Sequence, residues 1–110
     1  MKVFIDTSIP MYASGKEHPL KRSCIGLLEM VAGGKLEAYT DSEVFQEILY
    51  RYHHIKQNEL GFKVFDLFSK IMNGAVLPVM FRDVKQARTL AESEVAAGLS
   101  PRDLIHLAVI

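Results

Sequence analysis

Val3-Phe4-Ile5-Asp6-Thr7-Ser8 is the stretch of sequence that decides the fold. The short apolar run at its start is typical of a buried strand, and the Asp-Thr-Ser that follows is typical of a helix start. Pro10 falls within the first turn of that helix, where its missing N–H costs nothing. The stretch therefore predicts a strand that ends at Asp6 and leads directly into a helix, which Gly15 closes.

Alternating helices and strands are predicted for the rest of the chain, from apolar residues at helical spacing and from short apolar runs. The expected elements are helix 20–31, strand 36–40, a helix capped by Asp41 or Ser42 with an apolar stripe from Val44 to Tyr52, helix 58–72, strand 75–80, a helix capped by Asp83 that runs to about Val95, and a final helix that opens at Ser100 and is still running at Ile110. This order implies an α/β fold with a mostly parallel sheet, and Pro78 places the third strand at an edge. Ligands of such sheets bind beyond the carboxyl ends of the strands, where Asp6 is expected.

Length and composition indicate one soluble globular domain over residues 1–110. Of the 110 residues, 49% are apolar and 24% are charged, and no linker, repeat or low-complexity tract interrupts them. Thirteen basic and thirteen acidic residues give a formal net charge of zero. This balance argues against nucleic-acid binding driven by bulk charge, and it weakly favours self-association.

A cytoplasmic location without membrane contact is expected. No apolar run approaches the roughly 18 residues of a membrane span, and the N-terminus reaches the charge of Asp6 too soon for a signal peptide. The single cysteine, Cys24, cannot pair within the chain, so the fold must be compatible with a reducing compartment. We expect Cys24 to be a small buried thiol rather than a reactive one.

Three carboxylates are candidates for chemistry, and each has an ordinary structural role as the alternative. Asp6 is placed to bind Mg²⁺ or Mn²⁺, which prefer oxygen ligands, or to cap the following helix. Glu47 falls on the polar side of its helix, where the alternative is a solvated side chain paired with Arg51. Asp103 is the third residue of the last helix, where an acidic side chain completes a capping box with Ser100.

The sequence contains no pattern typical of a zinc site, a phosphate-binding loop or a nucleophilic catalytic site. The four histidines lack the spacing of zinc ligands, and His106, one turn after Asp103, is interpreted as a core residue or a neighbour of a ligand. No Gly-rich phosphate loop, nucleophile elbow or Cys/His dyad occurs. By elimination, any chemistry has to use carboxylates and a metal.

Three stretches of the chain together resemble the PIN domain family, and specifically the small VapC-type toxins of toxin–antitoxin pairs. They are Val3–Ser8 with its Asp6, Asp41–Leu49 with Glu47, and Gly98–Ala108 with Asp103, the last being the most specific. Their order and separation also fit, so the resemblance covers essentially the whole chain. It implies a Rossmann-like, three-layer α/β/α fold around a mostly parallel sheet.

The chain departs from the family at its C-terminus. The family continues with another strand that ends in a Thr/Ser-x-Asp element, which supplies a fourth carboxylate, and nothing here matches that element. The final helix also lacks a C-cap. We therefore expect a chain that is truncated before its last strand, rather than a protein whose site is incomplete.

The resemblance implies an endoribonuclease that hydrolyses RNA phosphodiester bonds with Mg²⁺ or Mn²⁺. On this interpretation Asp6 and Asp103 are direct metal ligands, and Glu47 is a ligand, directly or through water, or positions the attacking water. The implied supporting residues are Thr7 and Ser8, as hydrogen-bond partners of a ligand carboxylate or the phosphate, and Arg51, Arg82 and Arg102, as candidate phosphate contacts that have ordinary surface arginines as the alternative. The implied partners are RNA, an antitoxin protein and a second copy of the chain in a homodimer.

Two other functions remain open. A non-catalytic PIN-like RNA-binding or scaffold module agrees with the missing fourth carboxylate and the zero net charge. A phosphatase with an aspartate nucleophile would also place Asp6 after the first strand. Such phosphatases usually carry a second acidic residue two positions on, where this sequence has Ser8.

Overall fold

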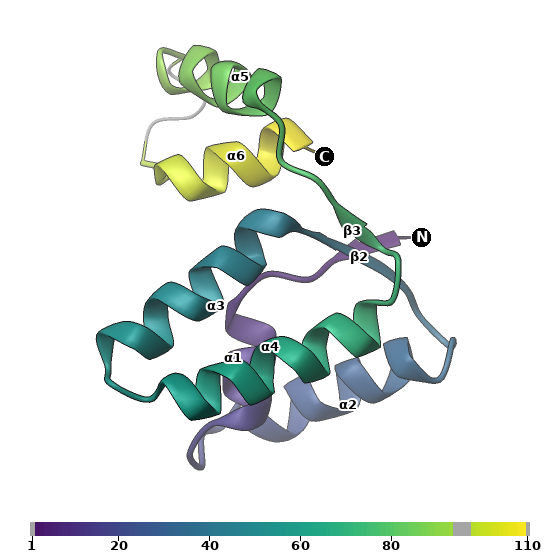
Figure 1. Ribbon diagram of the computed structural model, residues 1–110. Helices are drawn as coiled ribbons and strands as arrows, with labels where there is room; N and C mark the ends of the chain where they lie inside the picture. Colours follow the sequence, from purple (N-terminus) through teal and green to yellow (C-terminus); the bar gives the residue numbers. More distant parts are fainter. Residues whose placement is uncertain (1, 94–97, 110) are drawn as a thin grey trace.

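Short strands alternate with helices in the computed structural model, which describes residues 2–93 and 98–109 (Figure 1). The elements are β1 (Lys2–Phe4), α1 (Ser8–Ser14), α2 (Lys21–Ala32), β2 (Glu37–Asp41), α3 (Ser42–His54), α4 (Asn58–Met72), β3 (Val76–Leu77), α5 (Phe81–Ala91) and α6 (Pro101–Val109). The predicted α/β class is confirmed, and most of the elements lie where the sequence predicts them.

The three strands form one parallel sheet in the order β1-β2-β3. Phe4 lies opposite Tyr39, and the hydrogen bonding continues past β1 because the Ile5 N–H donates to the Tyr39 carbonyl at 2.8 Å. The predicted parallel arrangement is confirmed, and so is the edge position of β3. The carboxyl ends of the strands consequently lie on one side of the molecule.

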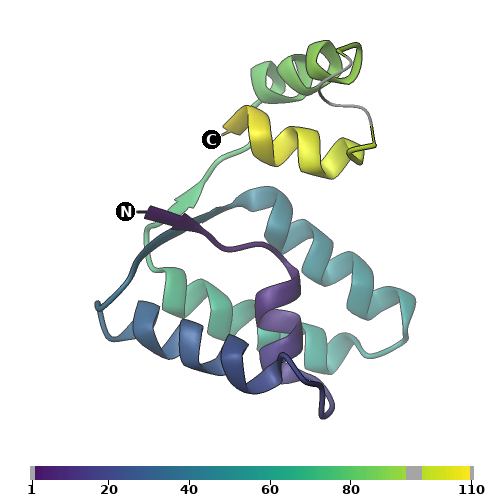
Figure 2. The same ribbon diagram turned by 180° about the vertical axis from the view of Figure 1, so that it is seen from behind.

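Helices cover both faces of this sheet, which gives the three-layer α/β/α arrangement that the resemblance implies. Figure 2 shows α1, α2 and α4 on one side of the strands and the paired α5 and α6 on the other. Helix α3 packs on α4 and also contacts α6. The main core is built from Ile5, which follows β1, and from buried apolar residues of α2, α3 and α4: Leu28, Val44, Phe45, Ile48, Tyr52, Val64, Phe68 and Met72.

The third strand and the fifth helix differ from their predictions. β3 contains only Val76–Leu77 instead of 75–80, because the next residue is Pro78, which lacks the N–H needed to extend the ladder. Helix α5 begins earlier than predicted, with Met80 as N-cap, so Asp83 is its third residue and not its cap. The Asp83 carboxylate still supports the helix start, because it accepts a hydrogen bond from the Met80 N–H at 2.7 Å.

The remaining expectations concern helix ends, the cysteine and the membrane. Helix α5 was predicted to run to about Val95, and this prediction is wrong: the helix ends at Ala91, with Glu92 as its C-cap and Ser93 outside the helix. Helix α6 is described to Val109, and Ile110, where we expect it to be still running, lies outside the described residues. Cys24 is buried in α2, as predicted. Over the described ranges, no helix combines the length and the apolar character that crossing a membrane requires.

The sheet and α6 bring distant parts of the chain to one edge. Asp6 follows β1, and Asp41 is the last residue of β2, so the parallel pairing places both at the carboxyl edge. Asp41, and not Ser42, caps α3, since its Oδ1 accepts a hydrogen bond from the Val44 N–H at 3.1 Å. Helix α6 approaches the same edge from the layer that it forms with α5, on the other side of the strands from α1, α2 and α4 (Figure 1).

Candidate metal centre

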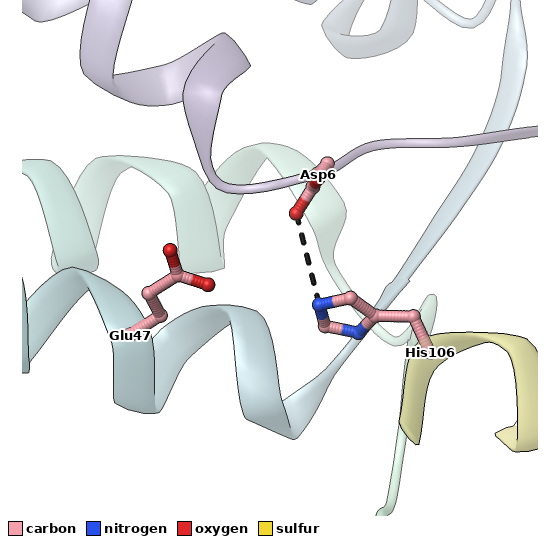
Figure 3. A group of neighbouring side chains, drawn as sticks. All are labelled: Asp6, Glu47 and His106. Atoms are coloured by element: carbon pink, nitrogen blue, oxygen red, sulfur yellow. Dashed lines mark ion pairs between the residues drawn. The ribbon is translucent and has the colours of Figure 1, made fainter. Parts of the chain in front are cut away.

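Asp6, Glu47 and His106 converge at the carboxyl edge of the sheet (Figure 3). They come from the β1–α1 connection, from α3 and from α6. One donor atom of each residue lies within 4.8 Å of the donor atoms of the other two. In the part of the chain that the structure describes, this is the one group of His, Cys, Asp or Glu side chains close enough to share a metal ion.

Asp6 occupies the turn between β1 and α1. Its side chain is 51% exposed, and the carboxylate faces His106 (Figure 3). Its Oδ1 also accepts a hydrogen bond from the N–H of Thr7, the N-cap of α1, at 2.6 Å. The carboxylate therefore contacts the start of a helix and faces the cluster at once, so the two interpretations of Asp6 from the sequence are compatible.

Glu47 is buried, with 7% of its surface exposed. Its Oε1 accepts a hydrogen bond from Thr7 Oγ1 at 3.1 Å, and its Oε2 pairs with Arg51 Nε at 3.0 Å. The predicted ion pair with Arg51 is thus present, but the interpretation of Glu47 as a solvated residue is wrong, because this side of α3 faces the β1–α1 connection. Of the two hydroxyls singled out in the sequence, Thr7 makes this buried contact and Ser8 is exposed.

His106 enters the cluster from α6 and is 6% exposed. Its Nδ1 lies 2.6 Å from Oδ2 of Asp41, a residue with no exposed surface. The other ring nitrogen, Nε2, lies 3.7 Å from Asp6 Oδ1, which is too long for a hydrogen bond. Among the described residues, Nε2 is a buried polar atom without a hydrogen-bond partner. Asp41 therefore holds the imidazole from one side while the opposite nitrogen points at the carboxylates.

The charges around His106 favour its protonated form in the absence of a metal. Burial lowers the pKa of His106, but the hydrogen bond to Asp41 and the negative charges of Asp41, Asp6 and Glu43 outweigh burial and raise the pKa above its ordinary value. The metal-free cluster thus keeps a positive charge between Asp41 and Asp6 over a wider pH range than an unperturbed histidine would. The surrounding negative charges therefore favour a positive charge at this position.

Asp103, the third predicted carboxylate, is not brought into this cluster. It is exposed in the first turn of α6, where its Oδ2 accepts a hydrogen bond from the Ser100 N–H at 3.3 Å. In return, the Asp103 N–H donates to Ser100 Oγ at 3.2 Å. These two bonds form the capping box that the sequence offers as the alternative. A role for Asp103 as a metal ligand stays a prediction.

The three arginines predicted as phosphate contacts have different surroundings. Arg51 pairs with Glu47, and Arg102 Nε lies 3.4 Å from Glu43 Oε1 and 3.9 Å from Glu47 Oε1. Arg82 is exposed on α5, and the ion pairs found within residues 2–93 and 98–109 do not include it. Two of the three arginines therefore border the acidic cluster.

Asp41 and His106 are the site residues that the sequence does not reveal. The sequence explains Asp41 as a helix cap and His106 as a core residue or a neighbour of a ligand. The sequence does contain one signal for each residue. Asp41 ends the second strand just as Asp6 follows the first, and His106 lies one helical turn from Asp103. The pair itself joins residues 65 positions apart, which no local pattern reports.

The donor set fits a divalent cation. Ligand atoms that share an octahedral ion at about 2.1 Å lie about 3 to 4.2 Å from one another. A separation within 4.8 Å therefore requires only a small contraction of the side chains around the ion. Two carboxylates offset the charge of the ion, Nε2 offers a buried nitrogen, and the half-exposed Asp6 leaves one side open to water and substrate.

Comparison with known proteins agrees with this architecture. A family model described as PIN domain matches residues 3–110. VapC ribonuclease Mb1869c of Mycobacterium bovis and ribonuclease VapC13 of Mycobacterium tuberculosis are each 38% identical to this chain over 109 residues, which are 98% of the chain and 80% of each relative. Ribonuclease VapC23 of Mycobacterium tuberculosis is 34% identical over 106 residues, which are 96% of the chain and 81% of that protein. No solved structure matches the chain significantly. The match to the family model and the identity to these relatives show that the chain belongs to the PIN domain family.

Proposed function

We propose that this protein is a metal-dependent endoribonuclease and the toxin of a toxin–antitoxin pair. The observation that carries the proposal is the 38% identity, over 98% of the chain, to relatives named as VapC ribonucleases. The convergence of Asp6 and Glu47 at the carboxyl edge of a parallel sheet supports it, because that edge is where ligands of α/β folds bind.

In the proposed site, Asp6 and Glu47 hold Mg²⁺ or Mn²⁺ through carboxylate oxygens. Asp103 stays in the proposal as a further ligand, since its hydrogen bonds to Ser100 are exposed and cost little to break. When bound, the cation lowers the pKa of a coordinated water and stabilises charge on the phosphate. Thr7 orients Glu47 through its hydrogen bond, which keeps one carboxylate oxygen in a set direction.

Phosphate recognition is assigned to Arg51 and Arg102. Both side chains are about half exposed, at 52% and 42%, and both pair with carboxylates at the edge of the cluster. An incoming phosphate can therefore approach a guanidinium group that is already positioned beside the site. Arg82, which none of the described ion pairs brings to the cluster, is the weakest of the three candidates.

The proposed partners are an RNA substrate, an antitoxin protein and a second copy of the chain, in the cytoplasm. Exposed apolar side chains of α2 and α3 offer contacts for a homodimer, among them Ile25, Met30 and Leu49. Sedimentation velocity would measure this association directly, and a monomer at all concentrations would contradict it.

Cleavage of RNA by the purified protein tests the proposal. We expect cleavage with Mg²⁺ or Mn²⁺, none with EDTA, and a loss of at least about 100-fold in Asp6→Asn, because the substitution removes a charged metal ligand. Asp66→Asn, at an exposed position of α4, is the matched control and should retain activity. RNA binding without cleavage that depends on metal and on Asp6 would instead support the non-catalytic module.

A further inference from the structure

We propose that Nε2 of His106 is a direct ligand of the metal in this site, held in place by Asp41, and that the site therefore binds Mn²⁺ in preference to Mg²⁺. This inference rests on the proposed function, because it concerns the same metal. It adds a nitrogen donor to the carboxylates and a chemical reason for choosing between the two cations.

The first observation is the unpartnered nitrogen. His106 is 94% buried, yet its Nε2 has no hydrogen-bond partner among the described residues. Native structures rarely leave a buried polar atom in this state, since it has lost its contacts with water and gained nothing in return. Nε2 points into the space between Asp6 and Glu47 (Figure 3), so a cation there would supply the missing partner.

The second observation is the contact on the opposite side of the ring. Asp41 Oδ2 lies 2.6 Å from Nδ1. A carboxylate at this position keeps the hydrogen on Nδ1 in the neutral imidazole, so the lone pair is on Nε2. The centroid of the Phe4 ring lies 5.2 Å from that of the imidazole, so the two rings pack against each other. Carboxylate, imidazole and metal in this order are the usual arrangement around histidine ligands.

An ion pair between His106 and Asp6 is a simpler explanation for the position of Nε2 beside the carboxylates. It leaves two features of the site unexplained. The distance of 3.7 Å is too long for a hydrogen bond from Nε2 to Asp6 Oδ1. An ion pair would also need only two residues, whereas a carboxylate oxygen of Glu47 lies within 4.8 Å of the donor atoms of both. A metal ion with three protein ligands accounts for both the gap and the third residue.

The donor types determine which cation this arrangement favours. Mg²⁺ prefers oxygen ligands in near-ideal octahedral geometry and gives up its water reluctantly. Imidazole is a better donor for first-row transition ions, which also bind carboxylates. Two carboxylates and one imidazole therefore favour Mn²⁺ over Mg²⁺, and His106 is the residue that makes the difference.

Pulsed electron paramagnetic resonance of the Mn²⁺-loaded protein tests the assignment without any substitution. We expect a nitrogen coupling typical of a coordinated imidazole, and we expect it to change isotope pattern when the protein is made with ¹⁵N-histidine. Bound Mn²⁺ without such a coupling would overturn the assignment. This measurement needs only the native chain, so it stays decisive if a variant fails to fold.

Variants then assign the coupling to His106. His106→Gln should abolish the coupling and weaken Mn²⁺ binding at least about 10- to 100-fold, with less than about a tenfold change for Mg²⁺. His53→Gln, at an exposed position of α3, is the matched control and should retain the coupling. A nitrogen coupling that persists in His106→Gln would overturn the proposal, and so would native protein that binds Mg²⁺ as tightly as Mn²⁺.

The role of Asp41 in orienting His106 can be tested separately from its role as the N-cap of α3. Asparagine caps helices about as well as aspartate, so Asp41→Asn retains an acceptor for the Val44 N–H. Its amide then presents N–H groups to Nδ1, which favours the tautomer with the hydrogen on Nε2 and so disfavours metal binding. We expect about 10- to 100-fold weaker Mn²⁺ binding with the fold retained, and unchanged affinity would overturn the positioning role.

The outcomes distinguish this inference from the proposed function. Metal-dependent RNA cleavage with bound Mn²⁺ that lacks nitrogen coupling would refute the His106 assignment and leave the ribonuclease standing. Nitrogen-coupled Mn²⁺ in a protein that cleaves no RNA would refute the ribonuclease and leave the metal assignment standing.

Discussion

The carboxylates of the site differ in the number of hydrogen bonds and ion pairs that they make within the protein. The buried Glu47 has a hydroxyl and a guanidinium group as partners, and the buried Asp41 has a backbone N–H and an imidazole. Such contacts offset the cost of burying a charge and hold each side chain in one orientation. Asp6 is half exposed and accepts a single hydrogen bond, from the neighbouring N–H. Asp6 is therefore the carboxylate best placed to move toward a cation, which is why the cleavage test changes it.

Protonation of the single residue His106 should make the stability of the metal-free protein depend on pH. Its pKa is raised in the folded state, so its contribution is fully present below the unfolded value of about 6.5 and is lost as the pH rises through the folded value. We expect the free energy of unfolding in EDTA to fall with rising pH above about 6.5, by at most about 1.4 kcal/mol per pH unit. Urea denaturation at a series of pH values measures this slope.

A substitution of His106 separates its contribution from other sources of pH dependence. His106→Gln should flatten the slope above about pH 6.5, because the titrating imidazole is gone. A slope that is equally steep in His106→Gln would show that a different group causes it.

Among the secondary-structure elements, α3 and α4 pack closely at a glycine. A Cβ added to Gly61 of α4 would lie 2.5 Å from the Cβ and 3.0 Å from the Cγ of Tyr52 on α3, and Tyr52 is buried. Alanine is favoured over glycine by about 1 kcal/mol in a helix interior, but overpacking costs about 1 to 3 kcal/mol. Since the contact is with an atom attached directly to the α3 backbone, we expect Gly61→Ala to destabilise the fold by about 1 to 2 kcal/mol in urea denaturation.

Gly26 of α2 is the matched control for this prediction. A Cβ at Gly26 meets nothing within 4 Å, so Gly26→Ala should gain helix propensity alone and stabilise the fold by up to about 1 kcal/mol. Opposite signs for the two substitutions would confirm that the packing of α4 on Tyr52 requires glycine. Stabilisation by both would show that the helices can separate at little cost.

In the whole molecule, the candidate metal centre lies where two parts of the fold meet. Helices α5 and α6 pack on each other through Ala87 and Leu104, apart from the main core (Figure 1). His106 and Arg102 connect α6 to Asp41, Glu43 and Glu47 in the rest of the molecule. A metal shared by Asp6, Glu47 and His106 would therefore join α6 to the sheet and to α3.

Metal binding should accordingly stabilise the whole fold. At a free Mn²⁺ concentration of 100 times Kd, binding contributes about 2.7 kcal/mol, which corresponds to a rise in Tm of roughly 10 °C for a domain of this size. Thermal unfolding with Mn²⁺ and with EDTA measures the shift. Hydrogen exchange should also slow in α6, because its opening would then require release of the metal.

Asp6→Asn is the control for this stabilisation. It should reduce the shift in Tm strongly, whereas Asp66→Asn on the exposed surface of α4 should leave it intact. A shift of equal size in Asp6→Asn would place the bound metal elsewhere. Slower exchange in α6 without any dependence on Asp6 would have the same meaning.

The linear sequence predicted the elements of this fold well where the pattern is local. The apolar run before Asp6 and the periodic stripes of α3 and α4 depend on neighbours within a few residues, so the chain itself reports them. The errors lie where one residue overrides the pattern. Pro78 ends β3 early, and the N-cap of α5 moves from Asp83 to Met80 because Asp83 supports the helix from its third position.

The same distinction separates the residues of the site. The position of Asp6 after a strand and the capping box of Asp103 follow from patterns of a few residues, and the resemblance to the PIN family follows from such patterns in order. The burial of Glu47 and the contact between Asp41 and His106 depend on which elements pack together. Burial depends on what lies across the helix surface, and a contact between residues 65 positions apart forms only when β2 and α6 meet. The sequence therefore determines the scaffold and the family, while the packing of α6 on the sheet edge places an imidazole beside two carboxylates.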